Sequence, residues 1–411
     1  MTTSNQATTT TPDAITESLA TILKVLVLTP TDDGMGAPAM FWGPPGVGKT
    51  AMLKTFARSV GVPLIVLSPG LDGEGAFGVT PVPVGEKKNM RITYPQPNWT
   101  DTLEDADDEG IVFIDEITTA GPQMQAPLLG LLQQRMVGRH FLGDRVRVLA
   151  AGNPPEQAAG GWDLAAPVAN RMGHFEWPAP TQAAWADYML AKKVHRPGDV
   201  KGYGAPPAGQ SLRDLEKLVF DGWEREYPRT AGLVTTFTNR RPALLHAMPE
   251  TGNANASRAW PSHRSWDLAA RVMTTAGILG IDEVATDLLI AGFVGSAVST
   301  EFVAFRSSTD LPNPEDVLTG AVQFNHDPHR LDRTMAVLAS CASLVAPEDA
   351  KDRDVRAAVL WNLMGTVLGT AMDTAVPAAR MLSKAKLGQL KAATPVLVKL
   401  RPVLDAAGIK A

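Results

Sequence analysis

The sequence predicts an α/β core, in which helices cover both faces of a parallel sheet, followed by an α-helical region. Three observations predict this fold class. A glycine-rich loop near residue 43 stands between an apolar run and a helical segment, a second apolar run ends in two carboxylates near residue 115, and helical patterns predominate after residue 178. The expected parts are a disordered lead (1–12), the core (13–178), a helical lid (179–310) and a helical extension (311–411).

The loop of residues 43–50 has the spacing of a phosphate-binding loop, G-x-x-x-x-G-K-[ST], and reads Gly43-Pro44-Pro45-Gly46-Val47-Gly48-Lys49-Thr50. The apolar run Ala37–Trp42 predicts the strand that enters the loop, and Ala51–Val60 predicts the helix that leaves it. Glycines let backbone N–H groups face phosphates, while Lys49 reaches the β- and γ-phosphates and Thr50 offers its hydroxyl to Mg²⁺. A chance match is the alternative, and the strand–loop–helix order argues against it. The loop predicts a nucleoside triphosphate as ligand.

A second apolar run, Ile111–Ile114, predicts a buried central strand that ends in Asp115 and Glu116. At the carboxyl end of a parallel strand, both carboxylates would lie beside the phosphate-binding loop. Asp115 is then placed to hold Mg²⁺, and Glu116 to orient the water that attacks the γ-phosphate. An ordinary strand end followed by an acidic helix cap is the alternative.

A third apolar run, Val146–Ala151, predicts a strand that ends before Asn153. The Asn153 amide could hydrogen-bond the attacking water or the γ-phosphate, and a plain turn at this position is compatible with that role. A helix over Trp162–Ala169 is expected next, and Arg171 follows it. An arginine at such a helix end could reach the γ-phosphate held by a neighbouring subunit, although composition alone favours a surface arginine.

In order, the segments GPPGVGKT, IVFIDE, AAGNPPE and ANRM resemble the AAA+ ATPases, and in particular the MoxR-like, dynein-related subgroup with an insert in the second helix. The resemblance implies ATP and Mg²⁺ as ligands, and it assigns the sensor 1 role to Asn153 and the trans-acting finger to Arg171. Residues 259–266 resemble the start of a lid helix whose arginine, sensor 2, touches the nucleotide from above. Arg264 fits best, with a spacing that departs by one residue, and Arg240 and Arg241 compete with it.

The resemblance also implies a ring of identical subunits, commonly a hexamer, that hydrolyses ATP to remodel, assemble or activate a partner protein, often one with a von Willebrand A domain. In such proteins an insert hairpin, here expected over residues 79–94, projects toward the pore, and an irregular surface loop is the alternative. Lys87, Lys88 and His140 are the exposed candidates for substrate contact. Two other function classes stay open, namely a nucleotide-dependent scaffold or switch with little turnover and a DNA-directed motor.

Charge, cysteine content and apolar runs bear on the function classes that are open. A net charge of −5 argues against a general nucleic-acid binder, and no strip of basic and aromatic residues accompanies the core. Cys341 is the single cysteine, which excludes an intrachain disulfide and fits a reducing cytoplasm. No signal peptide or membrane-spanning run is expected. The tail from Arg380 to Ala411 has seven Lys/Arg and one Asp, so it could dock an acidic partner, although a solvent-facing basic helix is the more ordinary reading.

Overall fold

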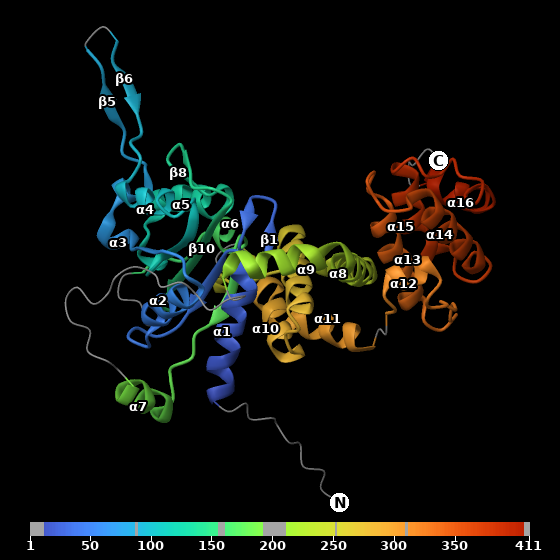
Figure 1. Ribbon diagram of the computed structural model, residues 1–411, viewed down its shortest axis with the longest axis horizontal. Coiled ribbons are helices and arrows are strands. Elements are labelled where there is room, and N and C mark those ends of the chain that lie inside the picture. Colours follow the sequence, from blue (N-terminus) through green and yellow to red (C-terminus); the bar gives the residue numbers. More distant parts are fainter. Residues whose placement is uncertain are drawn as a thin grey trace, which may run out of the picture.

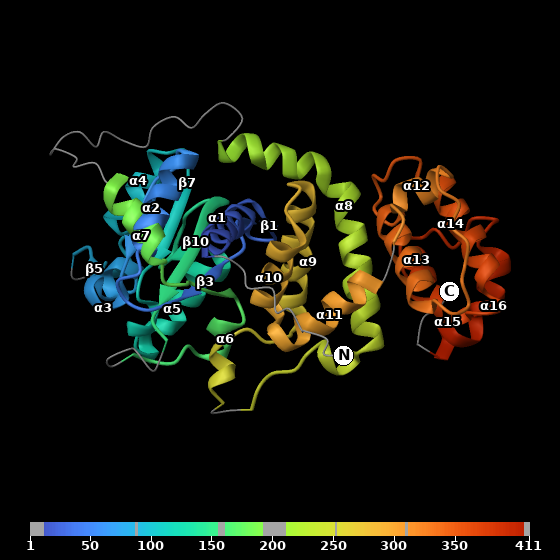
Figure 2. The same ribbon diagram turned by 90° about the horizontal axis from the view of Figure 1, so that it is seen from below.

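The structure, a computed structural model, describes residues 12–86, 89–154, 161–191, 211–250, 253–308 and 311–406. The expected disordered lead up to residue 11 and the candidates Lys87 and Lys88 lie outside the described residues. An α/β core occupies one end of the molecule, a layer of long helices follows it, and a helical bundle forms the other end (Figures 1 and 2). The predicted fold class is confirmed.

A five-stranded parallel sheet forms the centre of the core, in the order β11-β3-β10-β7-β4. Its strands β3 and β7 are buried along their whole length, which explains why they read as unbroken apolar runs. Because all five strands run in one direction, the residues that follow β3, β7 and β10 meet at one edge of the sheet. The strands are β3 (Ala39–Trp42), β4 (Leu64–Leu67), β7 (Glu109–Ile114), β10 (Arg145–Gly152) and β11 (Gly173–Glu176).

Helices cover both faces of this sheet, and alternate residues of β3 serve the two layers. Phe41 belongs to the hydrophobic core shared with α1 (Pro12–Leu28) and α2 (Lys49–Val60). Met40 and Trp42 belong to the core shared with α5 (Pro122–Gln134) and α6 (Ala166–Ala169). Two short helices, α3 (Pro69–Asp72) and α4 (Asp101–Glu104), lie on the path between β4 and β7.

The helix expected over Trp162–Ala169 is wrong in its first half, since only α6 is helical. Extended residues before α6 already have partners for their backbone groups. The N–H of Trp162 donates to the Thr118 carbonyl (2.7 Å), and the side-chain amide of Gln125 bonds both the Asp163 carbonyl (3.1 Å) and the Ala165 N–H (2.7 Å). These contacts satisfy the segment without a helix.

Three short hairpins are attached to the core in the described part of the chain. The expected insert hairpin is present as β5 (Val82–Val84) paired with β6 (Arg91–Thr93), and it projects far from the body (Figure 1). The second hairpin, β8 (Met136–Val137) and β9 (His140–Phe141), turns at Gly138 with φ of 60°. A third hairpin, β1 (Pro30–Thr31) and β2 (Gly34–Met35), was not predicted.

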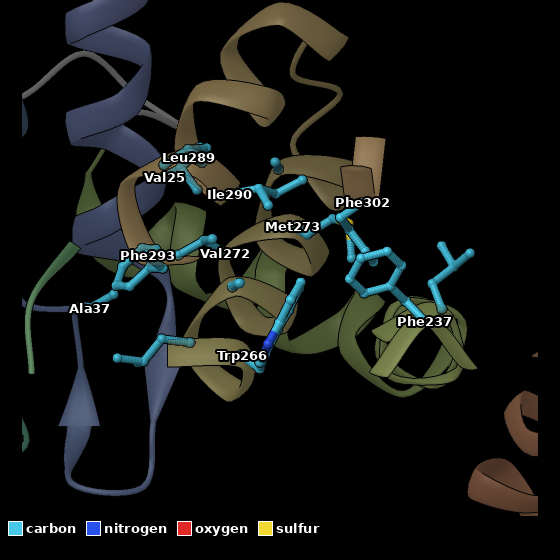
Figure 3. Close-up of a cluster of buried hydrophobic side chains, with 14 of the residues drawn as sticks. Val25, Ala37, Phe237, Trp266, Val272, Met273, Leu289, Ile290, Phe293 and Phe302 are labelled. Atoms are coloured by element: carbon cyan, nitrogen blue, oxygen red, sulfur yellow. The ribbon is translucent and has the colours of Figure 1, made fainter. Parts of the chain in front are cut away.

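The middle layer packs its helices around a continuous aromatic core. Phe237 of α8, Trp266 of α9 and Phe302 of α11 form ring contacts with centroid distances of 5.2–5.5 Å (Figure 3). Helix α8 continues through the buried Pro228 and packs against α9 and the bundle. The helices of this layer are α8 (Leu212–Arg240), α9 (His263–Ile278), α10 (Glu283–Val294) and α11 (Ser296–Ser308), whereas α7 (Gln182–Ala191) lies on the side of the core (Figures 1 and 2).

The C-terminal bundle rests on α8 through its helix α13. Gly232 makes this approach possible, because a Cβ there would lie 2.0 Å from Ser340 Oγ. Cys341 is buried in the bundle core, and burial raises the pKa of its thiol to about 12. Within the described part of the chain, no helix is long and apolar enough to cross a membrane. The bundle comprises α12 (Pro314–Thr319), α13 (Leu331–Val345), α14 (Arg353–Val367), α15 (Met372–Lys384) and α16 (Thr394–Ala406).

Candidate functional site

The loop between β3 and α2 has the backbone conformation that phosphate binding requires. Gly46 and Gly48 adopt left-handed φ values of 79° and 89°, and Gly48 is the N-cap of α2. Gly43 is required for a different reason, since a Cβ there would lie 2.7 Å from the Trp177 carbonyl oxygen. The first N–H groups of α2 therefore face the loop, where an anion would find both donors and the positive end of the helix dipole.

Lys49 lies in the centre of this loop and is buried. Its ammonium donates to the carbonyls of Gly43 (2.8 Å) and Pro44 (3.1 Å) and to Asn153 Oδ1 (3.2 Å). Burial lowers the pKa of Lys49, and the two carboxylates that follow β7 partly oppose this. The structure thus joins Asn153 to the loop through Lys49, although the two residues are 104 positions apart.

Thr50 and Asp115 form the second contact at this edge. The Thr50 hydroxyl donates to Asp115 Oδ2 at 2.6 Å, across 65 positions of sequence. A threonine hydroxyl and a carboxylate are hard oxygen donors of the kind that Mg²⁺ uses beside phosphates, and their proximity shows that both can reach one ion. The donor set therefore fits Mg²⁺.

Glu116 follows directly and has an unusual backbone. Its φ is 53°, in the left-handed region that residues other than glycine rarely adopt, and its side chain is exposed. The conformation is held by its own N–H, which donates to Asp115 Oδ1 (3.1 Å), and by its carbonyl, which accepts from the Thr119 N–H and hydroxyl (2.8 Å each). Such strain is common at functional sites. An exposed carboxylate beside the loop can contact an attacking water.

Arg171 lies at the opposite edge of the sheet. It precedes β11, whose first residue Gly173 pairs with Ala39 at the start of β3, whereas the phosphate-binding loop follows the end of β3. At least the length of a four-residue strand, about 13 Å, therefore separates Arg171 from the loop of its own chain. Its Nε donates to Gln133 Oε1 (2.7 Å) and its Nη1 to the Pro167 carbonyl (2.6 Å), so neutral acceptors orient the guanidinium.

Arg264 lies beside Arg171 rather than beside the loop. Both line a polar cavity of about 230 Å³, and after burial the charge of Arg264 is the second cause that lowers the pKa of Arg171. Asn170 fixes this arrangement, because its amide accepts from Ser262 Oγ (2.7 Å) and donates to the Trp260 carbonyl (3.2 Å) at the start of α9. The structure thus does not bring Arg264 to the loop of its own chain.

The two other candidates for sensor 2 are close to carboxylates of the helical regions. Arg240 pairs with Asp332 of α13 at 3.3 Å, and Arg241 lies 3.6 Å from Glu301 of α11. Arg135, which follows α5, is a buried structural residue whose guanidinium donates to the carbonyls of Val146, Met35 and Gly36.

The proposed substrate-contact residue His140 flanks the turn of the β8–β9 hairpin, where it pairs with Val137. Its Nε2 lies 3.6 Å from Glu104 Oε1, and the ring is partly covered. The acidic run of residues 101–109, which leads into β7, ends in a buried residue. Its last residue, Glu109, is buried with Arg147 Nη1 at 3.2 Å and receives Arg213 Nε at 2.9 Å.

The sequence did not indicate an aromatic stack under the loop. Trp42, the last residue before the loop, donates from Nε1 to His174 Nδ1 at 2.9 Å, and His174 Nε2 lies 2.9 Å from the Ala169 carbonyl. Arg258 covers the other side of Trp42, with its guanidinium carbon 3.9 Å from the ring centroid. Because His174 Nδ1 accepts, the imidazole is neutral and its proton is on Nε2.

A large cavity lies along the sheet edge next to the loop. It measures about 950 Å³ and is mostly apolar, with α1, β11, α10 and the segment before α9 in its wall. Glu176 belongs to that wall and pairs with Trp42 in the sheet register, so the cavity begins one strand away from the loop. Leu19, Ile22, Leu288 and Trp260 also line it.

Comparisons with known proteins agree with this geometry. Residues 39–159 match the family described as "ATPase family associated with various cellular activities (AAA)". The chain is 29% identical over 197 residues to the ATP-dependent zinc metalloprotease FtsH of Rhodococcus erythropolis, which covers 44% of this chain and 21% of that protein. It is 26% identical over 212 residues to the ATP-dependent Clp protease ATP-binding subunit ClpX 3 of Methylococcus capsulatus, which covers 50% of this chain and 46% of that protein.

The chain therefore spans less than half the length of these curated relatives. A solved structure from Cytophaga hutchinsonii matches 73% of this chain and 95% of its own, with 14% identity and a TM-score of 0.44, which is too distant to carry an argument. The matched segment contains the loop, both carboxylates and Asn153, and it ends before Arg171.

Proposed function

We propose that this chain, whose residues 39–159 are an ATPase domain of the AAA family, hydrolyses ATP at a seam between two copies of itself. One observation carries the proposal. Lys49, Thr50, Asp115 and Asn153 converge at one edge of the sheet, whereas the guanidinium of Arg171 is held at the opposite edge by neutral acceptors and pairs with no carboxylate of the described residues. A single copy cannot bring both sets to one phosphate.

Each residue has a role that follows from its position. Lys49 and the α2 N-terminus would bind the phosphates, and Glu116 would polarise the attacking water, which Asn153 helps to orient. Thr50 and Asp115 would hold Mg²⁺, which when bound offsets negative charge on the phosphate oxygens. Arg171 of a neighbouring copy would stabilise charge that develops on the γ-phosphate.

The position of Arg264 adds a second arginine to the proposed seam between two copies. In the same chain it cannot touch the nucleotide from above, and its proximity to Arg171 supports a second contribution in trans. Asp32, Asp33 and Asp267 line the same cavity, and two of them, Asp32 and Asp267, pair with Arg271. Two adjacent guanidiniums repel each other, and a triphosphate of the neighbouring copy would offset that repulsion. The apolar cavity beside Trp42 is the region of the same chain that supports binding of the nucleoside half.

The finer parts of the proposal follow the resemblance. We include a closed ring, commonly of six copies, a MoxR-like role in remodelling or activating a partner protein, and a cytoplasmic location. The projecting β5–β6 hairpin supports a contact with such a partner, because Val84, Met90 and Ile92 are 55%, 58% and 70% exposed. A von Willebrand A domain is the partner type that the resemblance suggests.

The dependence of turnover on protein concentration tests the seam. If each active site needs two copies, ATP hydrolysis per subunit rises steeply as the copies associate, and it stays constant once they are fully assembled. Arg171→Ala should keep ATP binding and lower turnover by about 10³-fold, in the range seen for arginines that act in trans. Turnover that is independent of concentration in a monomeric protein would contradict the proposal.

A scaffold or switch with little turnover is the competing function. The left-handed, exposed Glu116 argues against it, because an idle site has no need of a strained carboxylate at this position. Glu116→Gln separates the two functions. The variant of an ATPase loses partner remodelling along with turnover, whereas a switch keeps its partner response when ATP is bound.

A further inference from the structure

We propose that the end of the C-terminal bundle formed by α15 and α16 is a docking surface for an acidic segment of a partner polypeptide. Five exposed cations, Arg380, Lys384, Lys386, Lys391 and Lys399, lie on α15, on α16 and on the segment between them, and we call this set the basic face. Residues 374–404 contain four lysines, two arginines and no Asp or Glu. The chain as a whole has the opposite balance, with 43 acidic and 38 basic residues.

Ion pairing among the described residues follows residue type. Arginines commonly meet a carboxylate, as Arg240, Arg306 and Arg356 do on α8, α11 and α14, whereas no described lysine does, on this face or elsewhere. Among the described residues, no carboxylate lies within 4.0 Å of a charged nitrogen of the basic face. Clustered like charges repel one another, so an approaching carboxylate relieves that repulsion and gains attraction.

The basic face is built on a fixed backbone. The turn between α15 and α16 is held from beneath, where the buried Trp361 donates to the Leu387 carbonyl (3.0 Å) and Arg353 donates to the Ala385 carbonyl (2.8 Å). Lys386 within this turn has φ of 62°, a conformation that glycine adopts with less strain. The cations are therefore presented by a rigid turn and two helices, which reduces the ordering cost of binding.

The chemistry of the face favours a polypeptide over other anions. Residues 374–404 contain no aromatic side chain on which a base could stack, and lysines outnumber the arginines that read guanine edges. Exposed apolar side chains are few, with Met381 at 37% and Val398 at 68%, so the face offers little to insert into a lipid surface. Lysines with few exposed apolar neighbours suit an acidic polypeptide segment.

The position of the basic face is suited to recruiting a partner polypeptide. Figures 1 and 2 show the C-terminal bundle at the end of the molecule away from the sheet, with α16 on its outer side, and α13 makes the main contact of the bundle with α8. A partner that docks on the basic face would therefore leave the phosphate-binding loop and the Arg171 edge uncovered. Docking and ATP hydrolysis can then occur in the same assembly, and the inference does not depend on the proposed ATPase mechanism.

Binding of a fluorescein-labelled peptide of alternating glutamate and serine tests the proposal, with fluorescence anisotropy as the readout on the full chain. The variant Lys384→Glu/Lys391→Glu/Lys399→Glu reverses the face. A matched control, Lys217→Glu/Arg229→Glu/Lys351→Glu, makes the same charge change at exposed residues elsewhere. We expect the face variant to weaken binding at least about tenfold and the control less than about twofold, with an affinity that falls as salt rises.

Three outcomes would overturn the proposal. The first is no salt-sensitive binding of the peptide by the unaltered chain, and the second is equal weakening by the face variant and the control. The third is tighter binding of duplex DNA than of the peptide through the same lysines, which would assign the face to nucleic acid. The thermal unfolding midpoint of each variant, compared with the unaltered chain, shows that a loss of binding is not a loss of folding.

Discussion

Protonation of His174 should destabilise the strand pair that carries the phosphate-binding loop. The imidazole accepts from Trp42 Nε1 and donates to the Ala169 carbonyl, and its ring stacks on Trp42 at a centroid distance of 6.0 Å. A proton on Nδ1 would face the Trp42 N–H and break that hydrogen bond. Burial, together with the charge of Arg258, lowers the pKa of His174 to about 4, and the hydrogen bond to Ala169 opposes this.

The sign and size of the effect follow from proton linkage. Between its ordinary pKa of 6.5 and the folded pKa of about 4, His174 binds a proton in the unfolded chain and not in the folded one. The free energy of unfolding therefore falls as the pH falls through this window. Linkage gives a loss of about 2 kcal/mol between about pH 7.5 and about pH 5, and partial solvent access to the ring makes this an upper limit.

Urea unfolding of the unaltered chain and of His174→Gln at these two pH values measures the effect. Glutamine can accept from Trp42 and donate to Ala169 but does not titrate, so the variant should lose about 2 kcal/mol less on acidification. His263→Gln, at an exposed position on α9, is the control and should lose as much as the unaltered chain. Equal acid losses in His174→Gln and the unaltered chain would refute the reasoning.

Three further changes test single contacts. Glu116→Gln should bind ATP with unchanged affinity and lower phosphate release at least about 100-fold, because the amide cannot take a proton from water; full turnover would exclude Glu116 as the base. Thr50→Val should raise the Mg²⁺ concentration needed for half-maximal turnover and Thr50→Ser should not, whereas equal Mg²⁺ curves would exclude the hydroxyl as a ligand. Arg147→Met removes the fully buried cation between Glu109 and Glu216, which keep only the half-exposed Arg213 and Arg145, and should cost about 3–5 kcal/mol in urea unfolding. Arg145→Met, at a half-exposed pair, should cost below about 1 kcal/mol, and similar costs for both would contradict the buried network.

The sequence was sufficient for the centre of the fold because its signals are local. Buried strands read as apolar runs, and the residues after β3, β7 and β10 meet at one edge because the strands are parallel. Lys49, Asp115 and Asn153 could therefore be placed near one another before their contacts were known. The β5–β6 hairpin was likewise marked by its two short β-prone segments around Gly85.

Contacts between distant segments could not be predicted in this way. Arg264 was expected above the nucleotide, but the bonds of Asn170 to Ser262 and Trp260 place it beside Arg171. His174 and Trp42 meet across 132 positions, and no local pattern marks such a pair. The continuation of α8 through Pro228 depends on packing against α9 and α13, which offsets the hydrogen bond lost at the proline.

ATP hydrolysis by mixed assemblies tests the seam most directly. Lys49→Ala copies lack a working loop, and Arg171→Ala copies lack the finger, so neither should hydrolyse ATP alone. In a random equal mixture, a seam is complete where an Arg171→Ala loop meets a Lys49→Ala neighbour, which gives about a quarter of the unaltered rate. That recovery is the predicted result, and a mixture no faster than the sum of the two separate variants would contradict a shared active site.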